Sequence, residues 1–123
     1  MDIKYWGTST HLDICGCDIT RVENKKVIIE YIAQLCKIIK MKKFGKTIIK
    51  YFGKKQGYCG YTAIQLIETS SICCHFGISK NGNIGYGYID LFSCKEYDFE
   101  KMKRFSINYF GAKKSRMKIL KRK

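Results

Sequence analysis

The sequence predicts an α+β fold, a two-layer sandwich in which two helices cover one face of an antiparallel sheet. Two segments with helical spacing of apolar residues stand among six shorter, strand-like segments. The pair Asn81-Gly82 between two of these strands is the signal of a hairpin turn. Helices on one face leave the other face of the sheet open, and we expect another subunit to cover it.

The first helix is expected over Asn24–Lys43, because apolar residues recur there at helical spacing and form one stripe. Gly45 is the expected stop signal. The second helix is expected over Phe99–Phe110, with Asp98 as its N-cap and Gly111 as its stop. The expected strands are Thr8–Cys15, Lys46–Phe52, Gly57–Ile67, Ser70–Phe76, Ile84–Ser93 and Ser115–Leu120.

Length and composition favour one domain over residues 1–123, with a basic C-terminal segment at 112–123. The chain contains no proline, and its 46% of hydrophobic residues is normal for a packed core. No run approaches the ~18 apolar residues of a membrane span. The first residues lack the layout of a signal peptide. We therefore expect a cytoplasmic protein that does not bind membranes.

The net charge of +14 comes from 24 basic and 10 acidic residues, and no acidic residue follows Glu100. Such a surface suggests an anionic partner, such as a nucleic acid, an acidic lipid or a phosphate-bearing small molecule. The basic end lacks the aromatic interleaving of nucleic-acid modules, so direct nucleic-acid binding is not expected. The alternative is that the lysines reflect an AT-rich genome and form only a solvated surface.

The seven cysteines predict reduced thiols, because their number is odd and no signal peptide is present. No Cys-x-x-Cys occurs, and His11 and His75 lie far apart in the sequence. We therefore expect no metal site. Most of the cysteines are expected to be small core residues.

Glu68 and Tyr58 are the candidate catalytic residues. Glu68 directly follows an apolar strand, where a carboxylate can be partly buried and then needs a partner or a cation. Tyr58 shares a strand face with Glu68, and Tyr61 points to the other face. An aromatic ring opposite a carboxylate can cradle a cationic ligand. The alternative is a strand-end glutamate facing water and tyrosines that are simply good strand formers. The candidate substrate-binding residues are Tyr61, Gln65, Ser70, His75, Lys114 and Arg116.

Three segments together resemble the short bacterial and archaeal S-adenosylmethionine decarboxylases. Residues 10–18, Thr-His-Leu-Asp-Ile-Cys-Gly-Cys-Asp, are similar to their first strand and Cys-Asp turn. Residues 57–60, Gly-Tyr-Cys-Gly, followed by an apolar strand that ends in Glu68, resemble their third strand. The most specific match is 85–94, which is similar to their Tyr-x-x-Ile-Asp-x-Phe-Thr-Cys segment. The resemblance covers most of residues 8–110.

The resemblance implies a decarboxylase-like fold and a site around Glu68. Family members cleave themselves at a Glu-Ser bond and convert the serine into a pyruvoyl group, the electron sink for decarboxylation. Here Thr69 follows Glu68, and the first histidine and the Trp-Pro-Glu of the family pattern are absent. In an active decarboxylase, Cys94 would be the proton donor.

The S-adenosylmethionine lyases of bacteriophages resemble this fold and need no pyruvoyl group. A similar enzyme accompanies type III CRISPR systems in antiviral defence and degrades a conjugate of S-adenosylmethionine with AMP. In such enzymes the substrate's own carboxylate attacks its Cγ, so that methylthioadenosine leaves and homoserine lactone forms. Glu68 and Tyr58 match the glutamate and tyrosine that such a site needs. No cofactor is implied.

The sequence therefore predicts a carbon–sulfur lyase that acts on S-adenosylmethionine or its AMP conjugate. One alternative is a pyruvoyl-dependent S-adenosylmethionine or amino-acid decarboxylase of polyamine synthesis. Another is a basic binding protein without catalysis. We expect a homo-oligomer, a trimer more than a dimer, because Tyr58, Ile64 and Leu66 line the open sheet face. A strand near the C-terminus would place Lys114, Arg116 and Lys118 on one face, where they could hold a phosphodiester.

Overall fold

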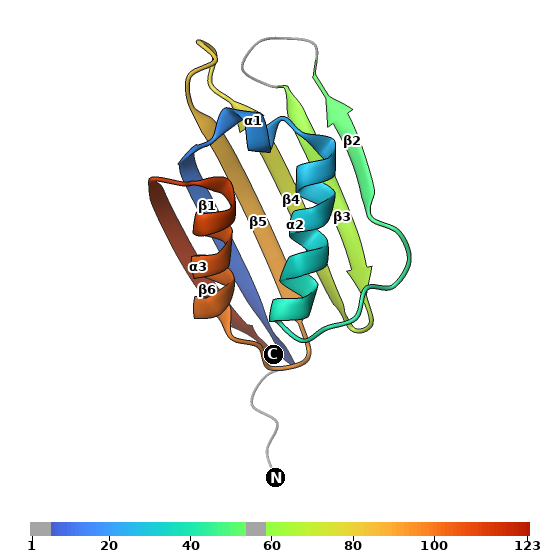
Figure 1. Cartoon of the computed structure of the whole chain (residues 1–123). Coiled ribbons are helices and arrows are strands. Elements are labelled where there is room, and N and C mark those ends of the chain that lie inside the picture. Colours follow the sequence, from blue (N-terminus) through green and yellow to red (C-terminus); the bar gives the residue numbers. More distant parts are fainter. Residues whose placement is uncertain (1–5, 54–58) are drawn as a thin grey trace.

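The protein is a two-layer α+β sandwich, as the sequence predicts (Figure 1). The computed structural model describes residues 6–53 and 59–123. A six-stranded antiparallel sheet has the order β2-β3-β4-β5-β1-β6, and α2 and α3 lie side by side on one of its faces. The strands are β1 (Gly7–Cys17), β2 (Ile48–Phe52), β3 (Gly60–Ile67), β4 (Ser70–Ile78), β5 (Gly85–Ser93) and β6 (Lys114–Arg122). The helices are α1 (Ile19–Val22), α2 (Lys25–Ile38) and α3 (Phe99–Phe110).

Local capping signals set the helix ends that the sequence predicts well. The Asp98 side chain accepts a hydrogen bond from the Lys101 backbone N–H, and Gly111 closes α3 in the left-handed conformation. The Asn24 side chain likewise caps α2. The short helix α1, capped by Asp18, was not expected.

The expected end of the first helix at Lys43 is wrong, because α2 stops at Ile38. Lys40 takes a positive φ of 59°, which interrupts the helix. The chain then runs beside the end of β3, where Lys43 bridges to Ile67 and the Phe44 N–H donates to the Leu66 carbonyl. The residues after Lys40 therefore extend the edge of the sheet instead of continuing the helix.

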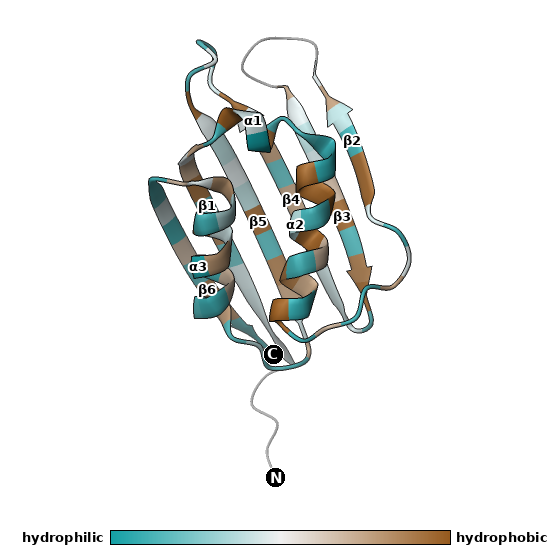
Figure 2. Ribbon diagram, in the orientation of Figure 1, coloured by the Kyte–Doolittle hydropathy of each residue, from teal (hydrophilic) through white to brown (hydrophobic). Residues whose placement is uncertain are grey.

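The core lies between the helices and the sheet, and Tyr31 of α2 is at its centre. Its ring lies 4.7 Å from that of Phe110 and stacks on Phe105 at 5.5 Å. Its buried hydroxyl is 2.6 Å from Ser106 Oγ, so the polar end of the ring has a partner. Hydrophobic and hydrophilic residues alternate along α2, as expected of a helix with one buried side (Figure 2).

The other face of the sheet is open in the single chain and carries large apolar side chains at one side. Ile64 and Leu66 of β3 are 39% and 52% exposed, and Ile48 of β2 is 55% exposed.

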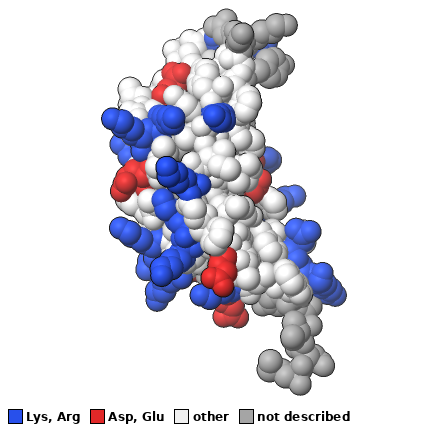
Figure 3. Space-filling view, turned by 90° about the vertical axis from the view of Figure 1, so that its right-hand side faces the viewer, with Lys and Arg blue, Asp and Glu red and all other residues white. Residues whose placement is uncertain are grey.

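In the view onto the β2 edge, Lys and Arg side chains gather on the helix side, at the left (Figure 3). No helix within the described residues is long and apolar enough to cross a membrane.

Candidate active site

Glu68 and Thr69 form the two-residue turn between β3 and β4, at one end of the sheet. Glu68 is exposed, so the expectation of a partly buried carboxylate is wrong. Thr69 has a φ of 61°, which is unusual for a β-branched residue. Its hydroxyl donates to the Glu68 carbonyl oxygen at 2.6 Å. The turn therefore presents a carboxylate to solvent on a strained backbone.

The base of this turn is held by a group of buried polar contacts with the end of β5. Ser70 Oγ donates to Ser93 Oγ at 2.7 Å, and both side chains are buried. Ser93 Oγ also accepts from the Lys95 N–H at 2.9 Å. The Cys94 N–H donates to the Thr69 carbonyl at 3.3 Å. The structure thus brings Glu68, Ser70 and Cys94 to the same end of the sheet.

An aromatic pair that the sequence reasoning missed lies close to this end, on the open face. The rings of Trp6 and Phe92 stack with their centroids 6.5 Å apart and an angle of 11°. Phe92 is paired with Ser71, the second residue of β4. The two rings and Arg122 line a cavity of about 310 Å³. Phe92 lies inside residues 85–94, the segment with the most specific family resemblance. That resemblance is the signal by which the sequence could have indicated Phe92 as a site residue.

Tyr61 and Gln65 lie on the helix side of β3, away from the open face. The Tyr61 ring packs edge-on against Tyr51 at 5.0 Å. Gln65 is fully buried, and its amide accepts from Thr47 Oγ1 at 2.5 Å and donates to the Gly45 carbonyl at 3.1 Å. These contacts indicate that Gln65 has a structural role in the fold. Tyr58 lies outside the described residues.

His75 lies on the open face, near the middle of β4. Its Nδ1 is 3.1 Å from Thr62 Oγ1, and its Nε2 is 3.7 Å from Cys73 Sγ. His11, distant in sequence, lies on the same face and contacts Asp90 at 2.8 Å. Even so, no group of three His, Cys, Asp or Glu side chains within residues 6–53 and 59–123 is arranged to hold a metal ion.

The basic residues of β6 follow the expected alternation. Lys114, Arg116 and Lys118 are paired with Cys15, Asp13 and His11 of β1, so they project from the open face. Arg116 is ion-paired with Asp13 at 3.0 Å. Lys114 lies at the start of β6, at the end of the sheet opposite the Glu68 turn. The cations and Glu68 therefore occupy different parts of the chain's surface.

Three of the seven cysteines are buried and four are half-buried, so the expectation that most of them are core residues is wrong. Burial raises the pKa of the Cys17 thiol to about 12 and that of Cys74 well above its usual value. These two thiols are therefore neutral at physiological pH and are poor nucleophiles.

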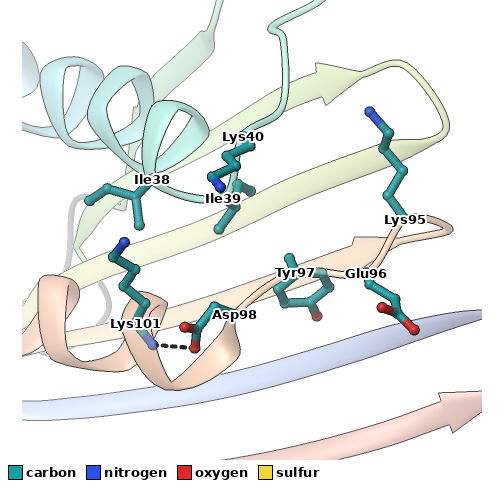
Figure 4. Close-up of a pocket in the computed structure, with 8 residues that line it drawn as sticks. All are labelled: Ile38, Ile39, Lys40, Lys95, Glu96, Tyr97, Asp98 and Lys101. Atoms are coloured by element: carbon teal, nitrogen blue, oxygen red, sulfur yellow. Dashed lines mark hydrogen bonds between the residues drawn. The ribbon is translucent and has the colours of Figure 1, made fainter.

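A separate cavity of about 530 Å³ opens on the helix side, between the end of α2 and the segment that joins β5 to α3 (Figure 4). Lys40 and Lys101 reach into this space, and Lys95 lies farther along it. The Tyr97 hydroxyl lies 2.6 Å from Thr10 Oγ1, which fixes the joining segment to β1. This cavity and the Trp6–Phe92 pair lie on opposite sides of the sheet.

Comparisons with known proteins agree with this fold. The family model described as S-adenosylmethionine decarboxylase matches residues 8–123. The crystal structure of the adenosylmethionine decarboxylase from Aquifex aeolicus VF5 superposes with a TM-score of 0.74 at 16% identity, covering 98% of this chain and 92% of that one. Among curated proteins, none matches the sequence.

Proposed function

This chain belongs to the S-adenosylmethionine decarboxylase family, and we propose that within it the protein is a carbon–sulfur lyase. Its substrate is S-adenosylmethionine or the AMP conjugate of that compound. The products are methylthioadenosine, or its AMP conjugate, and homoserine lactone. The proposal groups the chain with the pyruvoyl-free lyases of bacteriophages and type III CRISPR systems, acting in the cytoplasm.

One observation carries the proposal: the Glu68 turn does not fit a serine-derived pyruvoyl group. The residue after Glu68 is Thr69, and the serine that follows has its hydroxyl buried and donated to Ser93 Oγ at 2.7 Å. A self-processing serine is activated by a general base that takes its proton, whereas the Ser70 hydroxyl donates to another serine hydroxyl, which is not such a base. His75, the one histidine of this segment, lies five residues farther along β4. If Ser70 is aligned with the family's serine, His75 falls at the family's second histidine, but Glu68 then stands one place too early. The first histidine and the Trp-Pro-Glu are absent in either register, so the chain keeps a glutamate here and lacks part of the family's processing residues.

The lyase reaction requires little of the protein beyond positioning. A C–O bond forms between the substrate carboxylate and Cγ while the Cγ–S bond breaks, and the positive sulfonium and negative carboxylate charges are both lost. A site poor in water favours this loss of charge. Folding the methionine part into a near-attack shape supplies the rest of the acceleration.

The residues at the Glu68 end suit these tasks. The exposed Glu68 carboxylate can hold the substrate's ammonium group, which keeps its charge throughout the reaction. The Trp6 and Phe92 rings can cover one side of the sulfonium.

Turnover by a Glu68→Gln variant tests the assignment. We expect the variant to fold normally and, at substrate concentrations below KM, to lose about 100-fold or more in turnover, because an amide binds the substrate's ammonium group far less well than a carboxylate does. Glu96→Gln is the matched control, since Glu96 is an exposed glutamate in the segment after β5. Products are identified by chromatography after incubation with each substrate. Near-normal turnover by the folded Glu68→Gln protein would contradict the assignment.

A decarboxylase remains the second candidate because of one contact. The Thr69 hydroxyl lies 2.6 Å from the Glu68 carbonyl oxygen, at the bond where family members cleave themselves. The intact mass of the purified protein separates the two functions. The lyase keeps a mass of 14.3 kDa. Two fragments divided directly before Thr69 or directly before Ser70, together with release of carbon dioxide, would replace the lyase by the decarboxylase. Binding of both substrates without turnover would favour the non-catalytic binding protein.

A further inference from the structure

We propose that a hollow on the open sheet face, between β5, β1 and β6, binds the phosphate and base of a nucleotide unit. Two adjoining cavities of about 310 and 230 Å³ form it, and both are lined by Asp13 and Arg116. We call these two cavities together the open-face hollow. The inference rests on the proposed function in assigning the hollow to the nucleotide part of that enzyme's substrate.

The strand register places the side chains of the hollow in two adjacent rows. In one row Arg116, Asp13 and Tyr88 are direct neighbours across β6, β1 and β5. In the next row Lys114 and Cys15 are followed by Tyr86. Directly opposed residues have Cβ atoms about 5 Å apart, so each row forms one continuous strip. Cationic and aromatic side chains therefore flank Asp13 from opposite sides.

The aromatic side of the hollow suits a planar base. Tyr86 and Tyr88 are alternate residues of β5, so both rings project from the open face, about 7 Å apart along the strand. Tyr88 is 47% exposed although strands flank it on both sides. Burial, together with the nearby Asp13 carboxylate, raises its pKa. At neutral pH its hydroxyl is therefore a neutral donor that can serve a base.

The cationic side of the hollow suits a phosphate. Arg116 makes one hydrogen bond to Asp13, from Nη2 to Oδ2 at 3.0 Å. A guanidinium carries five N–H donors, so most remain for an anion, and its planar shape matches a phosphate. Its side chain is 79% exposed, which leaves it open to a ligand. Lys118 lines the second cavity beside Arg116 and adds a further positive charge.

The carboxylate between these two sides points to a nucleotide more than to an inorganic anion. Asp13 is 38% exposed, so its oxygens can accept hydrogen bonds from ribose hydroxyls. A simple anion would be repelled by the Asp13 carboxylate and would leave the faces of the tyrosine rings unused. The hollow thus has an aromatic surface for the base, a carboxylate for the ribose hydroxyls and cationic donors for the phosphate. These groups follow one another in the order base, ribose and phosphate of a nucleotide.

The position of the hollow agrees with a substrate larger than S-adenosylmethionine. Tyr88 and Phe92 are four residues apart on β5 and project from the same face, which separates them by about 13 Å. A ligand of dinucleotide size can span this distance. Its reacting part would lie beside Phe92 and the Glu68 turn, and its second nucleotide would lie in the open-face hollow.

Titration with AMP tests the inference without any turnover. We expect saturable binding by calorimetry, weaker binding of adenosine and of ribose 5-phosphate, and an affinity that falls as salt rises. Arg116→Gln should weaken AMP binding about tenfold or more and flatten its salt dependence. Tyr88→Leu should weaken AMP and adenosine equally and leave ribose 5-phosphate unchanged. Circular dichroism confirms that each variant is folded.

Matched controls lie on the other side of the molecule. Arg104→Gln, on the exposed side of α3, and Tyr51→Leu, on β2, should leave AMP binding unchanged. Absence of saturable AMP binding would overturn the inference, as would equal effects of the control and hollow variants. Turnover of S-adenosylmethionine by a protein that does not bind AMP would refute the hollow and keep the lyase. AMP binding without turnover of either substrate would support the open-face hollow and refute the lyase.

Discussion

Replacing Gln65 by leucine should destabilise the fold without acting on a ligand directly. Gln65 is fully buried on the helix side of β3. Its amide nitrogen donates to the carbonyls of Leu66 at 2.9 Å and Gly45 at 3.1 Å, and its oxygen accepts from Thr47 at 2.5 Å. Leucine fills a similar volume and makes none of these bonds.

The expected loss of stability follows from the groups that would be left without a partner. The Leu66 carbonyl keeps its bond from the Phe44 N–H, so it is not orphaned. The Gly45 carbonyl and the Thr47 hydroxyl lose the partner that Gln65 supplies, but Gly45 is exposed and Thr47 is half-buried, so each lost bond costs only about 1 kcal/mol. The added apolar burial of leucine offsets part of this. We expect a net loss of about 1 kcal/mol, which lowers Tm by roughly 4 °C for a chain of 123 residues.

Thermal and urea unfolding followed by circular dichroism would measure this loss. Gln34→Leu is the control, because the Gln34 amide bonds only to Glu30 across one turn of α2, at 3.0 Å. We expect that change to stay within about 0.5 kcal/mol. A Gln65→Leu protein as stable as the control would refute the structural role. If such a protein also lost affinity for S-adenosylmethionine, Gln65 would be the substrate-binding residue that the sequence predicts.

Two further predictions concern assembly and pH. Light scattering should give a multiple of 14.3 kDa, three copies more readily than two, because Ile64 and Leu66 leave apolar surface on the open face. Leu66→Lys should shift the protein toward monomers, whereas a monomeric mass for the unchanged protein would refute the expectation. The free energy of unfolding should fall as pH rises from 9 toward 12, because folding raises the Cys17 pKa from 9.0 to about 12. The expected fall is up to about 1.4 kcal/mol per pH unit for this thiol. Below pH 9 the thiol is neutral in both states, so this contribution to stability is complete there. Urea unfolding across this range should show a shallower fall for Cys17→Ala, and an equal fall would exclude Cys17 as a cause.

The parts of the fold that depend on local signals could be predicted from the sequence. The bounds of α3 are as expected, since the Asp98 cap and the Gly111 stop act within one turn of the helix. The face of Lys114 and Arg116 follows from the alternation of a strand. The end of α2 could not be predicted in the same way, because Lys43 pairs with Ile67, a residue of a distant strand.

The candidate site depends on which residues of different strands lie at the same level along the sheet. The composition of the sequence does not determine that alignment. Gln65 and Glu68 are three residues apart, but one is sealed in the core and the other is exposed in a turn. Trp6 and Phe92 meet only because β1 and β5 pair. His11 and His75 share a face for a similar reason, across three neighbouring strands. Such relations require the strand order, which the sequence pattern leaves open.

The position of β6 at the edge of the sheet also bears on aggregation. An edge strand offers unpaired backbone groups that can recruit the edge of another molecule into a continuous intermolecular sheet. Five of the nine residues of β6 are Lys or Arg. Two copies brought together along this edge would oppose cation to cation over the whole strand, and that repulsion disfavours fibril-like stacking. The basic end of the chain therefore opposes edge-to-edge association of copies of the protein. Neutralising its lysines by acetylation should make the protein more prone to form amyloid-like sheets.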